Sequence, residues 1–150
     1  MLVINSLMRD IMEEYQIWTL FNSARIGNSL SIIATILLIW LGLRTAMQTR
    51  TPTSGEEPNI IAKVLSTGFC ALIVFFTYNV WTFASASGPI TARALSDLKA
   101  SGVEISSAAQ GYIEYVGTTE PTGISVPGMV FLIIVLIMML GQIWLPKQSD

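Results

Sequence analysis

The side chains that carry out most enzyme chemistry are scarce in this chain. It has no histidine and one cysteine, so Ser-His-Asp and Cys-His catalysis, histidine-ligated metals and haem, and internal disulfides are all excluded within it. Neither GxGxxG nor GxxxxGK[ST], the glycine-rich phosphate-binding motifs, occurs. The sequence therefore gives no catalytic residue, no cofactor-binding residue and no cofactor.

Carboxylates and thioethers near the N-terminus are the remaining groups with ligand chemistry. Asp10, Glu13 and Glu14 have no histidine or basic partner that would make them catalytic, and a solvated helix face accounts for them. Met8 and Met12 lie one helical turn apart, and thioethers bind Cu(I). Methionine on an apolar helix face is far more often packing material, so we expect no metal site.

The elements that must position any functional group are apolar helices. Hydrophobic residues make up 52% of the 150 residues and charged residues 12%, against about 25% charged in a soluble domain. Charged residues are absent between Arg25 and Arg44, between Lys63 and Arg93, and between Glu120 and Lys147. Each gap is close to the roughly 20 residues that cross a bilayer, which predicts an all-α integral membrane protein with three transmembrane helices.

The expected organisation alternates these spans with polar segments. It comprises an amphipathic N-terminal helix (1–25), a first span (26–43), a polar loop (44–63), a second span (64–84), an extramembrane loop (85–126), a third span (127–145) and a tail (146–150). Within the long loop, Pro89 could open a short helix that ends at Gly102. A second short helix could start at Ser106 or Ser107 and end at Gly117.

The N-terminal segment has the clearest amphipathic pattern. Its apolar residues recur at three- and four-residue spacing: Ile4, Leu7, Met8, Ile11, Met12, Tyr15 and Trp18. Such a helix either lies in the membrane interface or docks on a neighbouring subunit. Its polar face has three acidic residues and one basic residue, whereas lipid-binding helices are usually basic, so we favour docking on protein.

Small residues at four-residue spacing indicate close helix packing in the first two spans. They are Gly27, Ser31 and Thr35 in the first span, and Ser66 and Cys70 in the second. No ionisable residue lies inside a span, which disfavours a stand-alone transporter or proton channel. Asn79 and Gln142 are the amides well inside the second and third spans, both towards an end, and each predicts an interhelical or interfacial hydrogen bond.

Together these features favour a non-catalytic accessory subunit of a multi-subunit membrane enzyme complex of the respiratory or membrane-oxygenase type. The expected partners are other integral membrane subunits and lipid; the net charge of −2 gives no reason to bind nucleic acid. The alternative is a self-assembling, holin-like or channel-forming protein. Four basic residues fall on each side of the membrane. Arg44, Arg50 and Lys63 lie in the short first loop close to the spans, which favours the N-terminus outside and the C-terminus inside a bacterial inner membrane or its equivalent.

Overall fold

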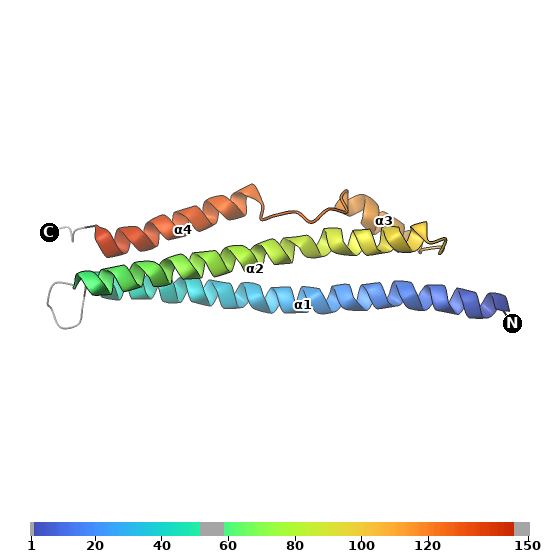
Figure 1. Ribbon diagram of the computed structural model, residues 1–150, viewed down its shortest axis with the longest axis horizontal. Coiled ribbons are helices and arrows are strands. Elements are labelled where there is room, and N and C mark those ends of the chain that lie inside the picture. Colours follow the sequence, from blue (N-terminus) through green and yellow to red (C-terminus); the bar gives the residue numbers. More distant parts are fainter. Residues whose placement is uncertain (1, 52–58, 146–150) are drawn as a thin grey trace. The chain divides into compact units, whose positions relative to one another are not determined.

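The computed structural model describes residues 2–51 and 59–145, with side chains described from residue 12 onward. This part of the chain is all-α and forms four helices: α1 (Leu2–Arg50), α2 (Ile60–Ala100), α3 (Ser107–Val116) and α4 (Val126–Trp144) (Figure 1). The helices α1, α2 and α4 are long and apolar enough to cross a membrane. The prediction of an all-α chain with three such helices is confirmed.

The chain divides into two compact units, which are described separately. One contains residues 1–29 and 82–123, and we call it the α3 unit. The other contains residues 30–81 and 124–150, and we call it the α4 unit. Helices α1 and α2 each contribute residues to both units.

In the α4 unit, α1 and α2 pair antiparallel. The hydroxyls of Thr49 and Ser66 lie 2.6 Å apart, and Trp81 Nε1 donates a hydrogen bond to Thr35 Oγ1 at 3.1 Å. Since residue numbers fall along α1 as they rise along α2 between these two contacts, the helices run in opposite directions. Apolar side chains fill the space between them.

Helix α4 packs antiparallel to α2 within the same unit. Its N-terminal half meets the C-terminal part of the α2 span, where the rings of Trp81 and Phe131 stack with centroids 5.7 Å apart. Near its other end, Trp144 Nε1 donates to Thr67 Oγ1 at 3.0 Å. The result is a three-helix arrangement held by aromatic and hydroxyl contacts at both ends.

The core of the α4 unit is built on one narrow seam of each helix, in which buried residues recur at three-, four- or seven-residue spacing. Its buried residues are Ile39 and Ala46 of α1, Cys70 and Ile73 of α2, and Val135, Met139 and Ile143 of α4. Gly42 lies in the α1 seam, and a Cβ built on it would sit 2.6 Å from Met139 Cε and 3.0 Å from Ile73 Cδ1. Glycine at this position lets the three helices approach closely.

The α3 unit packs the short helix α3 against parts of α1 and α2. Its buried core consists of Leu95, Leu98, Ile105 and Ala109, with Ile17, Trp18, Val103, Tyr112 and Ile113 packed around it. Local signals set the bounds of α3. Ser106 is the N-cap and accepts from Ala109 N, while Gly117 ends the helix with a φ of 68°, a left-handed conformation that favours glycine.

A separate amphipathic helix before the first span was a wrong prediction, because α1 is continuous from Leu2 to Arg50. No proline lies at the expected boundary between residues 25 and 26, so no backbone donor is lost there. Ser23 Oγ donates to Thr19 O at 2.9 Å, which satisfies its hydroxyl on the helix itself. Gly27 alone disfavours the helix by about 1 kcal/mol relative to alanine, too little to end it.

The expected short helix after Pro89 is likewise the C-terminal part of α2, which continues to Ala100. Proline in a helix interior removes one backbone hydrogen bond and disfavours the helix by about 3 kcal/mol. In the part of α2 beyond Pro89, the side chain of Leu95 is completely buried and that of Leu98 is nearly so. Burying two leucines contributes about 1.5–3 kcal/mol each, which is enough to offset the proline.

Candidate functional site

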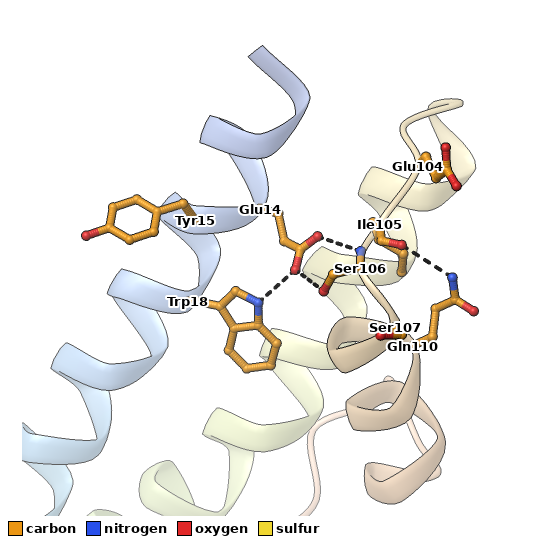
Figure 2. Close-up of a pocket in the computed structure, with 8 residues that line it drawn as sticks. All are labelled: Glu14, Tyr15, Trp18, Glu104, Ile105, Ser106, Ser107 and Gln110. Atoms are coloured by element: carbon orange, nitrogen blue, oxygen red, sulfur yellow. Dashed lines mark hydrogen bonds between the residues drawn. The ribbon is translucent and has the colours of Figure 1, made fainter. Parts of the chain in front are cut away.

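In the α3 unit, the carboxylate of Glu14 accepts three hydrogen bonds (Figure 2). Its Oε1 accepts from Ser106 Oγ at 2.6 Å and from Trp18 Nε1 at 3.0 Å. Its Oε2 accepts from Ser106 N at 2.8 Å. Both carboxylate oxygens thus bind the residue that caps α3, and a negative charge at a helix N-terminus is stabilised by the helix dipole.

The electrostatics of Glu14 suit a structural anchor better than an acid–base group. Desolvation by burial raises the pKa of Glu14, but the hydrogen bonds from the Ser106 hydroxyl, the Ser106 N–H and Trp18 together lower it below its ordinary value. A general acid or base working near neutral pH needs a carboxyl pKa that is raised instead. Glu14 therefore stays ionised and holds α3 against α1.

A half-open pocket of about 610 Å³ surrounds this carboxylate. It is lined by Glu14, Tyr15, Trp18, Glu104, Ile105, Ser106, Ser107 and Gln110 (Figure 2). The Gln110 amide turns to the backbone, where Nε2 donates to Ile105 O at 3.3 Å. The polar groups of Glu14, Trp18 and Ser106 are thus hydrogen-bonded to one another, and the Gln110 amide is bonded to the backbone.

Aromatic rings connect the pocket to the inside of the α3 unit. Trp18 and Phe21 both meet the ring of Tyr112 edge-on, with centroids 5.2 and 5.3 Å away, and the Arg25 guanidinium lies 5.6 Å from the Phe21 centroid. Burial raises the pKa of Tyr112; the charge of Arg25 lowers it and that of Tyr115 raises it, and the net result is an increase. These rings fasten α1 to α3.

The residues predicted to dock on a partner take different positions in the structure. Met12 and Tyr15 are 58% and 69% exposed, whereas Trp18 turns into the α3 unit. The side chains of Ile4, Leu7, Met8 and Ile11 lie outside the described residues. Docking on a partner thus stays a prediction that rests on Met12 and Tyr15, and the sequence pattern gave no sign that Trp18 belongs to the protein's own core.

The small residues predicted to pack between helices differ in burial. Those buried in the α4 unit are Thr35, Ser66 and Cys70, and Cys70 Sγ lies 3.6 Å from Gly42 O. Ser31 is half-buried, and Gly27, in the α3 unit, is exposed with no atom within 4 Å of a built Cβ. Gly42 was missed, although its four-residue spacing from Ala46 repeats the same small-residue pattern.

The largest candidate interaction surface is apolar and belongs to the long helices. Only 17% of the most apolar window of α1, and 22% of those of α2 and α4, is buried within the chain. Large exposed side chains on them include Ile33 and Leu37 of α1, Leu72 and Phe75 of α2, and Ile134 and Ile137 of α4. Water would solvate such surfaces poorly, so they need a cover of lipid or other helices.

Among the described residues, no three His, Cys, Asp or Glu side chains come together as metal ligands. Met139 is buried in the α4 unit and Met138 beside it is exposed.

Comparison with protein-family models, with curated proteins and with solved structures gives no match for this chain. Function must therefore be argued from the surfaces themselves.

Proposed function

We propose that this chain is a multi-pass integral membrane protein that acts as a non-catalytic subunit of a membrane enzyme complex. The observation that carries the proposal is the exposure of α1, α2 and α4, since no more than 22% of each apolar window is buried within the chain. Three such helices in one chain provide lipid-facing surface and also leave faces against which further membrane subunits can pack.

A packing role is supported by what the polar side chains do. In the α4 unit the hydroxyls of Thr67 and Thr77 each donate to a carbonyl of their own helix, at 2.8 Å. Gln142 Oε1 accepts from Arg50 Nη1 at 3.3 Å, near the ends of α4 and α1. These groups close local helix contacts, whereas a transport pathway needs polar groups aligned through the spans.

The proposed topology places the N-terminus outside and the C-terminus inside, in a bacterial inner membrane or its equivalent. Arg44, Arg50 and Lys63 then lie on the inner side, close to the ends of the first two spans, in accord with the positive-inside rule. Arg44 lies 5.7 Å from the Trp40 ring and Lys63 lies 5.8 Å from the Trp144 ring. Aromatic–cation pairs of this kind favour a position at a membrane interface.

The test is to isolate the chain from its native membrane. A C-terminal tag, mild detergent extraction and mass spectrometry of the purified particle should reveal stoichiometric membrane subunits, with metal, haem or flavin among them. A particle that contains this chain alone would refute the accessory role and favour the self-assembling alternative.

Variants on α1 sharpen this test. Gly27→Leu introduces a large side chain where no atom lies within 4 Å, so it should leave the chain folded and reduce co-purification if a partner packs there. Tyr15→Ser tests the exposed N-terminal surface, and Tyr115→Ser, on an 87% exposed side chain of α3, is the matched control. If neither Gly27→Leu nor Tyr15→Ser lowers the recovery of partners, no partner packs at these two positions of α1.

A further inference from the structure

Helix α2 has two roughly opposite seams with heptad spacing, and only one of them packs against other described residues of the chain. The inner seam consists of Ser66, Cys70, Ile73 and Thr77, all buried in the α4 unit. The outer seam consists of Ile61, Leu65, Gly68, Leu72, Phe75 and Asn79, and all six residues are exposed. Its spacing alternates four and three residues over the whole length, which is the pattern of helices that pack as coiled coils.

The amide of Asn79 distinguishes this outer seam from the other exposed faces. Asn79 Nδ2 donates to Phe75 O on its own helix at 2.7 Å. The second N–H and the side-chain oxygen have no partner within the described part of the chain. An amide in an apolar span is stabilised by a hydrogen bond to a polar group of another helix, because lipid tails offer no such group.

Gly68 provides the room that a close helix contact needs. It lies eleven residues before Asn79, about three helical turns, and so on the same side of α2. A Cβ built on Gly68 meets no atom within 4 Å. The outer seam thus combines a glycine where two backbones can approach with an amide where they can bond.

We propose that the outer seam of α2 binds the same seam of a second copy of this chain, forming a parallel two-fold dimer. The proposal rests on the membrane insertion proposed above. Copies inserted with one topology hold Asn79 at the same depth, so identical amides meet across an axis along the membrane normal. An amide with a free donor and a free acceptor complements its own image, and a lone Asn in a heptad seam fixes register and oligomeric state.

The exposed face of α4 contrasts with this seam. On α4 the outward side chains are large and apolar, and they include Val130, Ile133, Ile134, Ile137 and Met138. Lipid satisfies such a face without any directed bond. Compared with this face of α4, the outer seam of α2 favours a specific partner over lipid.

The experiment is cysteine cross-linking of the full-length chain in membranes, in a Cys70→Ala background. Phe75→Cys and Phe76→Cys form a matched pair, because both phenylalanines are similarly exposed but only Phe75 lies on the seam. We expect an oxidant to link Phe75→Cys copies into a disulfide dimer and to leave Phe76→Cys monomeric, since a disulfide needs Cβ atoms about 3.5–4.5 Å apart. Equal cross-linking at both positions, or none at Phe75→Cys, would overturn the proposal.

Affinity variants test the two features of the seam separately. Asn79→Leu should weaken the dimer about tenfold and Asn79→Gln should retain most of it, as measured by energy transfer between labelled chains in lipid vesicles. Gly68→Leu should abolish the dimer, whereas Gly27→Leu, at an equally open glycine, should not. If Asn79→Leu dimerises as tightly as the unchanged chain, the amide contact does not exist.

Two further outcomes separate this proposal from the one on which it rests. A chain that resists alkaline extraction from membranes but stays monomeric refutes the dimer and leaves membrane insertion intact. A chain that alkaline treatment releases refutes insertion and the dimer together. Cross-linking of Phe75→Cys to a different membrane protein would show that another partner occupies the seam, which also refutes a second copy of this chain.

Discussion

The contact between Glu14 and Ser106 predicts how firmly α3 is held. Glu14→Gln keeps the size of the side chain but removes its charge and puts an NH₂ group in place of one carboxylate oxygen. One of the three hydrogen bonds, from Ser106 N at 2.8 Å or from Trp18 at 3.0 Å, must then break, because an NH₂ group cannot accept it. A hydrogen bond to a charged group contributes about 1.5–3 kcal/mol, and the partial exposure of Glu14 in an open pocket favours the lower end of this range. We expect α3 to lose about 1.5 kcal/mol of local stability.

Hydrogen exchange of the α3 backbone amides measures this loss directly. Because 1.4 kcal/mol is a factor of ten in an equilibrium, amides within residues 110–116 should exchange about tenfold faster in Glu14→Gln, while those of α4 should not change. Glu13→Gln is the matched control, since Glu13 is exposed one residue away. It removes the same charge without touching Ser106.

The serine side of the contact provides an independent check. Ser106→Ala removes both the N-cap of α3 and one bond to Glu14, whereas Ser107→Ala changes the exposed neighbour. In a double-mutant cycle, Glu14→Gln and Ser106→Ala should be non-additive, because they share one bond. If Glu14→Gln and Glu13→Gln exchange alike, or if the cycle is additive, then Glu14 does not anchor α3.

Three further predictions follow from the same structure. Since the pKa of Glu14 is lowered on folding, its contribution is complete above the ordinary glutamate range and is lost as pH falls through the lowered value; the protection of the α3 amides relative to their intrinsic exchange rates should fall over this range, and less so in Glu14→Gln. Gly42→Val forces its side chain toward Met139 and should destabilise the α4 unit by about 1–3 kcal/mol in thermal unfolding in detergent, an effect absent from Gly27→Val. Leu95→Ala, in the core of the α3 unit, should cost about 2–5 kcal/mol and release α3 in hydrogen exchange while α4 stays protected.

Local and compositional signals made part of this structure predictable. The three apolar helices follow from the absence of charge over span-length segments, a property of the sequence alone. The ends of α3 follow from Ser106 and Gly117, whose capping chemistry acts within four residues. Helix ends were harder to predict from the sequence. The unfavourable free energy of Pro89 inside a helix must be compared with the favourable free energy of burying Leu95, and that burial depends on residues distant in sequence.

The contacts of the Glu14 site lay beyond such signals. Glu14 and Ser106 are 92 residues apart, and no pattern around either residue points to the other. The amphipathic pattern placed Glu14 on a solvated face, and the structure shows that one turn of this face meets the start of α3 instead. Trp18 was misjudged for the same reason, since an apolar residue on a helix face has the same spacing whether it meets the chain's own core or a partner.

The two seams of α2 show why periodicity cannot by itself assign a helix face. Both seams alternate four and three residues, and in an apolar span nearly every residue fits one pattern or another. Shape decides which seam is used inside the chain: Gly42 of α1 admits Met139 and Ile73, so the α2 face that includes Ile73 and Cys70 turns inward. Gly68 and Asn79 are then left on the opposite side. A single missing Cβ on α1 thus favours the orientation in which the Asn79 amide is presented outward.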